Sequence, residues 1–452
     1  MISRLLITIA LSVPLLAAAD DAAGLTPAAP VAPATPAQQM PLSLPDCIAR
    51  ARSSSKSLRQ ARRQIAIADW QVREAWAPAL PHISAGWKNT WRNNDMGASM
   101  GDFSFVTGDR STAVGALSAT LTVMDFGKSG WYREAMLILK ESVTFEADRS
   151  GQSLDLAVTK SYIGVLAATR LITVAEQEVH LLDRQLAVTE DLFKQGQVAP
   201  NDRLAVAVQR KDREQGLIKA RNARAMTQAA LNRLLGQDLE SELHLVDILD
   251  QPAWDGTSEH ATRLALMYRP DLASVRSRVK AGQAGVRSAK ASLLPRIYVF
   301  GEYAGTNDSR ILNKTWWDGG IGASFSIFDG GATIAQAGRA LEELAQLEDI
   351  AADRLDQIRL EVRQAWLSLS SARERIAVAA SSLKLAEENV AHTQDRYGQG
   401  LASSTDVLAD EDRLAQARFN HAEALYDQRS AYAELVLAIG IDPVNLAPEK
   451  QP

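Results

Sequence analysis

Cysteine is almost absent from this sequence, because Cys47 is the single one among 452 residues. One cysteine excludes an intrachain disulfide, so the stability of the fold must come from packing. Cys47 lies well inside the chain, which excludes the acylated N-terminal cysteine of a lipoprotein. We expect Cys47 to be a small buried residue of the first helix.

Patterns typical of enzymes and of metal or nucleic-acid binding are also missing. The six histidines are scattered without the spacing of a metal site. Gly330-Gly331 is followed by no Gly-Lys-Ser/Thr, which excludes a phosphate-binding loop, and no nucleophile elbow occurs. The net charge of −5 is mild and no Lys/Arg run appears, which argues against a nucleic-acid partner. We therefore expect no enzyme, no metal site, no cofactor and no nucleic-acid partner.

Long hydrophobic runs are restricted to the start of the chain. Arg4, the apolar run 5–16 and three alanines ending at Ala19 predict a signal peptide over residues 1–19, with a buried N-terminal helix as the alternative. Residues 20–41 are rich in Ala and Pro, which predicts a disordered segment. No later run reaches the ~18–20 apolar residues of a transmembrane helix. An exported chain of this kind is either soluble or crosses a membrane as β-strands.

Proline is absent from two long stretches, 128–195 and 332–398. Apolar residues recur in both at helical spacing, so each stretch predicts one continuous helix. At ~1.5 Å per residue, a helix of roughly 65 residues is about 100 Å long. The chain then reverses at a Gly-containing turn, and shorter return helices are predicted over 201–235 and 405–439.

The long helices belong to an internal repeat. Phe193, Gly196, Asp202 and Leu204 match Tyr397, Gly400, Asp406 and Leu408, each pair 204 positions apart (397 − 193, for example). We therefore divide the chain into repeat 1 (42–236), a connector (237–257), repeat 2 (258–440) and a C-terminal tail (441–452). Each repeat is predicted to begin with one helix, roughly 45–77 and 258–293, which ends at a Leu-Pro pair.

Two segments of alternating apolar and small polar residues follow in each repeat. They predict β-strands over 82–91, 112–123, 297–304 and 318–328. Runs of roughly 9–11 residues have the length of a tilted membrane strand. Aromatic residues lie near the strand ends, where an interfacial belt would place them: Trp87, Trp91, Trp316 and Trp317. The alternative is a water-exposed periplasmic hairpin with one apolar face.

The number of strands bears on oligomeric state. Four strands cannot close a barrel, and an open sheet edge cannot lie in lipid. Two chains would give eight strands, a barrel filled by side chains, whereas three would give twelve with room for a lumen. The expected fold class is therefore mainly α with a membrane β-barrel part. Two repeats would contribute four strands per protomer to a trimeric 12-stranded barrel and form a long antiparallel helical tunnel.

Several short motifs, in this order and spacing, resemble those of TolC-type outer-membrane factors, the outer membrane efflux proteins. The motifs are Tyr397-Gly398-Gln399-Gly400 before Thr405-Asp406-Val407-Leu408, the first-half counterpart around Phe193 and Asp202, Arg269-Pro270-Asp271-Leu272, Leu294-Pro295, and Phe328-Asp329-Gly330-Gly331. The resemblance covers residues 42–443. It implies a homotrimer in outer-membrane lipid, a closed periplasmic tip, and docking to a periplasmic adaptor and an inner-membrane transporter.

The resemblance and the repeat together point to candidate site residues. Asp202 and Asp406 follow the two turns and would form carboxylate rings at the pore entrance, or act only as helix caps. The family's second gate acid is replaced by Ala409, and Asp410 lies one turn beyond Asp406 as a substitute. The turns themselves would contact the adaptor, or are simply loops: Gly196, Gln197, Val198, Ala199, Gly400, Leu401, Ala402 and Ser403.

These expectations define a function. The chain would be the outer-membrane channel of a tripartite export system, serving drug or small-molecule efflux or type I protein secretion. The cell outer membrane with a large periplasmic portion would be its location. The alternative is a soluble periplasmic coiled-coil scaffold without a pore. The sequence names neither the cargo nor the class of inner-membrane transporter.

Overall fold

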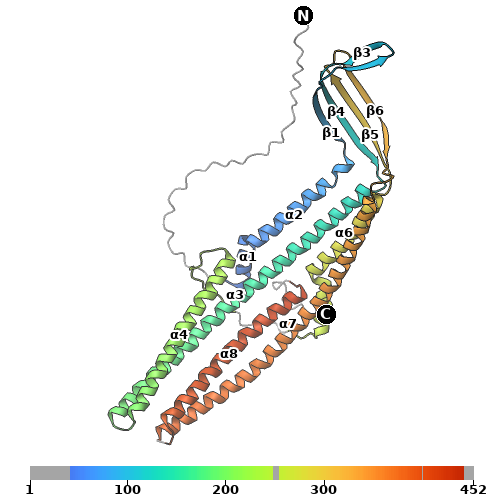
Figure 1. Cartoon of the computed structure of the whole chain (residues 1–452). Coiled ribbons are helices and arrows are strands. Elements are labelled where there is room, and N and C mark those ends of the chain that lie inside the picture. Colours follow the sequence, from blue (N-terminus) through green and yellow to red (C-terminus); the bar gives the residue numbers. More distant parts are fainter. Residues whose placement is uncertain (1–40, 248–253, 400, 442–452) are drawn as a thin grey trace. The chain divides into compact units, whose positions relative to one another are not determined.

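The computed structural model describes residues 41–247, 254–399 and 401–441 (Figure 1). The predicted signal peptide, the Ala/Pro-rich segment up to residue 40, Gly400 and the tail from residue 442 lie outside the described residues. The chain divides into two units, Met1–Met40 and Pro41–Pro452.

A four-stranded antiparallel sheet unites the two repeats. Its strands are β1 (His82–Trp91), β4 (Ser111–Met124), β5 (Arg296–Thr306) and β6 (Thr315–Ser324), in the order β1-β4-β5-β6. The predicted strand 318–328 begins three residues earlier and ends four earlier, so Phe325 and Ile327 lie outside the sheet. β4 and β5 pair at the centre, which leaves β1 and β6 as free edges.

The register of the sheet gives it two chemically different faces. Ser84, Ser118, Glu302 and Asp318 lie side by side in one row across the four strands. Alternate residues point to opposite faces, so Ile83 and Ile321 belong to the other face. There they are 67% and 77% exposed. Apolar side chains left this open need an apolar environment, whereas the opposite face suits water.

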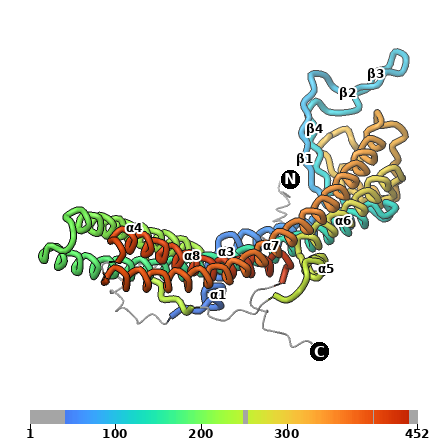
Figure 2. The backbone as a smooth tube through the Cα atoms, turned by 90° about the horizontal axis from the view of Figure 1, so that it is seen from below, coloured from blue at the N-terminus to red at the C-terminus, as the bar shows by residue number. Residues whose placement is uncertain are grey.

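Two long helical hairpins follow the strands. The long arms α3 (Lys128–Lys194) and α7 (Ala332–Gly398) have 67 residues each, and the return arms α4 (Pro200–Leu235) and α8 (Ser404–Ile439) have 36 each. These bounds lie within one residue of the expected ones. Figures 1 and 2 show the arms running side by side, with the turns at the end away from the sheet.

The same device starts both long helices. Asp125 accepts hydrogen bonds from the backbone N–H of Gly127 (3.1 Å) and of Ser129 (2.9 Å). Asp329 accepts the equivalent bonds from Gly331 (3.1 Å) and Thr333 (3.0 Å). These bonds satisfy N–H groups that a helix start leaves unpaired. The two repeats therefore share the same hydrogen bonds at the start of their long helices.

The helix before each strand pair is broken, contrary to the single helices expected. The first half has α1 (Leu44–Ser54) and α2 (Lys56–Glu74), and the second has α5 (Ser258–Tyr268) and α6 (Pro270–Ala291). Ser55 caps α2 by accepting from the N–H of Leu58 (3.3 Å). At the second break, the residue before Pro270 is extended, as a prolyl ring requires.

Arg269 occupies that second break and is fully buried. Its guanidinium donates to Asp271 (2.6 Å), to Glu361 of α7 (2.5 Å) and to the carbonyl of Ala438 in α8 (3.3 Å). Hydrogen bonds from Arg269 and Arg354 overcome the burial of Asp271 and hold its pKa far below the usual range. The ion pair with Glu361 and the hydrogen bond to Ala438 therefore fix the α5–α6 break against both arms of the second hairpin.

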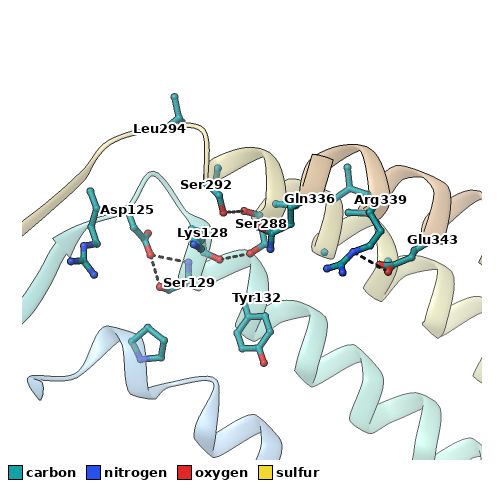
Figure 3. A pocket seen from close by; sticks show the side chains of 18 of the residues that line it. Asp125, Lys128, Ser129, Tyr132, Ser288, Ser292, Leu294, Gln336, Arg339 and Glu343 are labelled. Atoms are coloured by element: carbon teal, nitrogen blue, oxygen red, sulfur yellow. Dashed lines mark hydrogen bonds and ion pairs between the residues drawn. The ribbon is translucent and has the colours of Figure 1, made fainter. Parts of the chain in front are cut away.

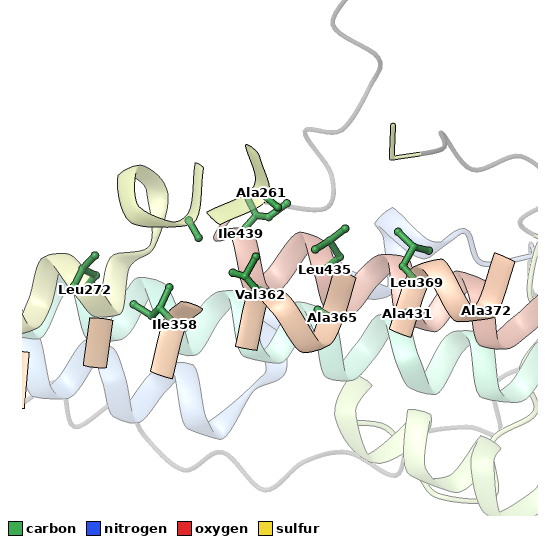
Figure 4. Close-up of a cluster of buried hydrophobic side chains, with 12 residues drawn as sticks. Ala261, Leu272, Ile358, Val362, Ala365, Leu369, Ala372, Ala431, Leu435 and Ile439 are labelled. Carbon is green, nitrogen blue, oxygen red and sulfur yellow. The ribbon is translucent and has the colours of Figure 1, made fainter. Parts of the chain in front are cut away.

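Two apolar clusters lie where the short helices meet the arms. One joins α5–α8 and includes Ile358, Val362, Leu435 and Ile439 (Figure 4). The other joins α1, α3, α4 and the connector around the buried Tyr162. The phenol of Tyr162 donates to the carbonyl of Leu42 (3.0 Å), next to a backbone bridge from Leu42 to Leu245 of the connector. Cys47 is buried in this second cluster, where desolvation raises its pKa to about 11.

One described helix, α3, contains an 18-residue window apolar enough to cross a membrane, with a mean hydropathy of 1.2. The expectation that no such run follows the first 16 residues was therefore too strict. A third of that window is buried within the chain. Val158, Tyr162 and Val165 of α3 belong to the second apolar cluster, so part of the apolar surface of this helix is used in core packing.

Candidate functional site

The first hairpin turn is built around Gly196. Its φ of +73° is a left-handed conformation that favours glycine. The N–H of Gln197 donates to the carbonyl of Leu192 (2.9 Å), which closes the end of α3. Gly196, Gln197 and Ala199 are exposed and Val198 is half-buried. The turn is therefore a compact, outward-facing tip.

The second turn has a similar construction in its described residues. The N–H of Leu401 donates to the carbonyl of Arg396 (2.8 Å), and the Arg396 guanidinium donates back to the carbonyl of Leu401 (3.1 Å). Leu401 is 64% exposed, Ser403 is exposed and Ala402 is half-buried. Both turns thus offer small, partly apolar surfaces at the end of the helices away from the sheet (Figure 1).

Asp406 and Asp202 occupy matching positions directly after the two turns. Asp406 accepts from the N–H of Ser403 (3.0 Å) and from its hydroxyl (2.8 Å), and these bonds lower the pKa of Asp406. Asp202 accepts from the N–H of Ala199 (3.2 Å). Asp406 remains exposed and Asp202 is half-buried. Both carboxylates therefore cap helices and still reach solvent, so the capping role does not exclude a role at an entrance.

Asp410 lies in a different environment and does not fit the proposed second ring. Its side chain is 9% exposed and accepts a hydrogen bond from the Thr393 hydroxyl (2.7 Å) and from Arg413 (2.5 Å). Neighbouring copies of the chain can only bury it further. Position 410 falls on the face of α8 that packs against α7, so we withdraw it as an entrance residue.

Sequence reasoning did not single out Tyr397 as a candidate site residue. Burial and the nearby charge of Asp202, which belongs to the other hairpin, raise the pKa of Tyr397. Close by, Leu182 and Val206 of the first hairpin pack with Leu408 of the second. The repeat already aligned Tyr397 with Phe193, and the additional hydroxyl was the available signal.

The tryptophans of the sheet divide between its two faces. Trp87, Trp91 and Trp317 are 73%, 74% and 78% exposed and lie on the apolar face. Trp316 is half-buried on the polar face, because adjacent strand residues point to opposite sides. The prediction of Trp316 as a membrane-interface aromatic is therefore wrong. The other three tryptophans share the apolar face.

A cavity of about 810 Å³ lies where the strands meet the helices (Figure 3). Arg296 and Thr122, which line it, belong to the polar face of the sheet. An ion pair of Arg339 with Glu343 (3.4 Å) borders it on α7. The cavity thus lies at the helix end of the polar face of the sheet, and its lining mixes polar side chains with apolar ones such as Leu344 and Leu347. Within the described ranges, no group of three or more His, Cys, Asp or Glu side chains could hold a metal ion.

These features define a class of protein: a four-stranded sheet with one exposed apolar face and one polar face, continued by long helical hairpins that end in exposed turns. The chain belongs to the outer membrane efflux protein family, whose profile matches residues 47–237 and 261–441. It is accordingly an outer-membrane protein with a periplasmic helical portion, which is incompatible with the soluble scaffold considered as the alternative.

Two curated relatives from Pseudomonas aeruginosa are similar over much of the chain. The alkaline protease secretion protein AprF is 24% identical over 382 residues, which are 81% of this chain and 77% of AprF. The pyoverdine export outer membrane protein OpmQ is 28% identical over 320 residues, 67% of this chain and 65% of OpmQ. Their names describe secretion of a protease and export of pyoverdine.

Solved structures share the fold. CusC aligns with a TM-score of 0.78 at 18% identity, covering 88% of this chain and 92% of that one. The outer membrane protein VceC from Vibrio cholerae aligns with a TM-score of 0.76 at 17% identity, covering 88% and 96%. The mainly helical architecture with an antiparallel sheet is thus that of TolC-like channels.

Proposed function

We propose that this protein is the outer-membrane channel of a tripartite export system, acting as a homotrimer. One observation carries the proposal: the sheet order β1-β4-β5-β6 leaves two unpaired edges beside an exposed apolar face, which we place in lipid. Unpaired backbone groups cannot remain in a bilayer, so β6 of one copy must pair with β1 of the next. Three copies close this arrangement with twelve strands and a lumen.

The lumen would be lined by the polar face. Glu302 and Asp318 lie side by side there, and Ser84 bonds Ser118 through their hydroxyls (2.8 Å) in the same row. Three copies would give six carboxylates at one level of the barrel. The cavity beneath the sheet would widen the passage into the helical tunnel. The proposed activity is conduction, not catalysis.

The exposed turns would serve as the docking end. An adaptor of the periplasm would contact the tips around Gly196 and Leu401, and an inner-membrane transporter would supply energy and select the cargo. AprF is named for protease secretion and OpmQ for pyoverdine export. We therefore propose type I protein secretion or small-molecule efflux as the two cargo classes.

The proposal is tested with outer-membrane fractions and purified protein. We expect trimers that resist SDS until heated, and cation-preferring conductance in planar lipid bilayers. Recovery of the mature chain as a monomer in the soluble periplasmic fraction would contradict both the trimer and the channel.

A further inference from the structure

A two-stranded ribbon extends the sheet beyond the end of β1 and β4. It consists of β2 (Met96–Met100) and β3 (Phe103–Gly108) and pairs with no other described strand. Because Met100 pairs with Phe103, and Ala98 with Phe105, these four residues share one face. Met100, Phe103 and Phe105 are 78%, 81% and 54% exposed. The ribbon thus carries an uncovered apolar face.

The opposite face of the ribbon is different. Ser99 pairs with Ser104, and Gly97 with Val106. Small and polar side chains therefore dominate that side. An isolated two-stranded ribbon is only marginally stable in water. One-sided aromatic and methionine side chains suggest that its apolar face is covered by another protein surface.

The base of the ribbon is fixed to the outer loop of repeat 2. The N–H and hydroxyl of Ser309 donate to Asp109 (2.7 and 2.9 Å), and these bonds lower the pKa of Asp109. The N–H of Asp109 donates to Asp308 (3.3 Å). A Cβ at Gly108 would lie 3.2 Å from the carboxylate of Asp308, so this contact is close. The ribbon therefore rises from a fixed position on the sheet.

Lipid is not the partner that these residues favour. Trp91 is followed by Arg92, two asparagines and Asp95. This polar stretch indicates that the chain leaves the membrane interface after Trp91. The ribbon itself, residues 96–108, contains one aspartate and no Lys or Arg, while Arg92 and Arg110 lie at its base. Its outer part therefore offers no cation to an anionic headgroup layer. Trp91 on the lipid side stays 74% exposed, so the ribbon does not fold over that face.

The dimensions favour a second copy of the chain. Twelve strands ~4.8 Å apart and tilted by ~40° close into a barrel of about 12 Å backbone radius. The five residues of β2 span ~17 Å at ~3.3 Å each. The ribbon is therefore long enough to reach the barrel axis, where the ribbons of the other two protomers would meet it.

We infer that the apolar faces of three β2–β3 ribbons pack on one another and cover the outer mouth of the channel. The inference rests on the proposed trimer. Met100, Phe103 and Phe105 of neighbouring ribbons would contact one another. The carboxylates of Asp102, at the tips of the three ribbons, would repel each other. This repulsion keeps the cover weak enough to part when cargo passes.

The test uses site-specific crosslinking in whole cells. The full chain carrying Cys47→Ala, to remove its only native thiol, receives Phe103→Cys on the apolar face. The matched control is Ser104→Cys, one residue away on the opposite face. After mild oxidation we expect disulfide-linked dimers on a non-reducing gel for Phe103→Cys, at least ten times more than for Ser104→Cys. Native gels of both variants report the trimer independently.

Each outcome decides the matter. Loss of the trimer already in the Cys47→Ala parent, with the wild type also monomeric, would refute the proposed function rather than the ribbon contact. Intact trimers in which Phe103→Cys does not crosslink would overturn the inference, whether the thiol is open to an impermeant maleimide or shielded by lipid. Equal crosslinking of both variants would also overturn it, because a free ribbon would then be colliding at random.

Discussion

At the scale of single residues, Asp406 combines two roles that can be separated. It caps α8 through Ser403 and still exposes a carboxylate behind the second turn. Removing the charge should change ion selectivity, whereas removing only the cap should not. A substitution at each partner distinguishes these effects.

We expect Asp406→Ala to lower the cation preference of the channel in planar bilayers. Ser403→Ala is the matched control, because it loses the capping hydroxyl, at a cost of about 1 kcal/mol, and keeps the charge. Reversal potentials in a salt gradient measure the preference. Equal selectivity in wild type and Asp406→Ala would mean that this carboxylate is only a cap.

A second residue-scale prediction concerns Glu411, buried between α7 and α8. One of its oxygens accepts from Gln394 (3.3 Å), the other has no partner, and burial raises the pKa. The folded state therefore holds its proton to a higher pH than the unfolded chain, so stability rises as pH falls through the folded pKa. We expect Glu411→Gln to raise Tm at pH 7, with a gain that shrinks toward pH 5.

Circular dichroism melts in detergent would follow that difference. Glu388→Gln, at an exposed position of α7, should leave Tm unchanged at both pH values. A constant gain for Glu411→Gln across the pH range would show that its charge is not what destabilises the packing.

At the scale of elements, the two faces of the sheet should tolerate different side chains. Ile321 lies on the apolar face of β6, and Ser118 on the polar face of β4. An arginine at mid-depth on a lipid face costs ~2–4 kcal/mol. We expect Ile321→Arg to abolish heat-modifiable trimers in the outer membrane and Ser118→Arg, beside Glu302, to preserve them. Normal assembly of Ile321→Arg would place that face outside lipid.

The elements also show what sequence could and could not reveal. The long helices were predictable because proline is absent and the apolar spacing is sustained. The ribbon was not, because glycines at 97 and 101 interrupt its alternation. The break at Arg269 carried a signal in Pro270, whereas the break at Ser55 carried none as strong. Asp410 was misplaced because its helix face depends on α7, which the spacing within α8 cannot reveal.

At the scale of the whole molecule, the two hairpins must end at one level. Their arms have equal lengths, and near the turns Leu182 and Val206 pack against Leu408. Removing seven residues, two turns of helix, from each arm of one hairpin would shorten it by ~10 Å. The turns would then no longer lie side by side.

We expect deletion of 385–391 together with 412–418 to abolish export. Deleting 181–187 and 208–214 as well should restore level tips and trimers of normal heat stability. Export by the variant with all four deletions then depends on whether the adaptor can reach the turns of the shortened hairpins. Normal export by the variant that lacks only 385–391 and 412–418 would show that the hairpins act independently.

The paired 67-residue arms have a consequence for the cell envelope. The length of these helices fixes the distance below the outer membrane at which a partner can bind the turns. Changing that length takes coordinated insertions in four helices at once, and each smaller step leaves the tips uneven. The length of this protein and the lengths of its partners must therefore match the distance between the two membranes. A change in one of them requires a change in the others.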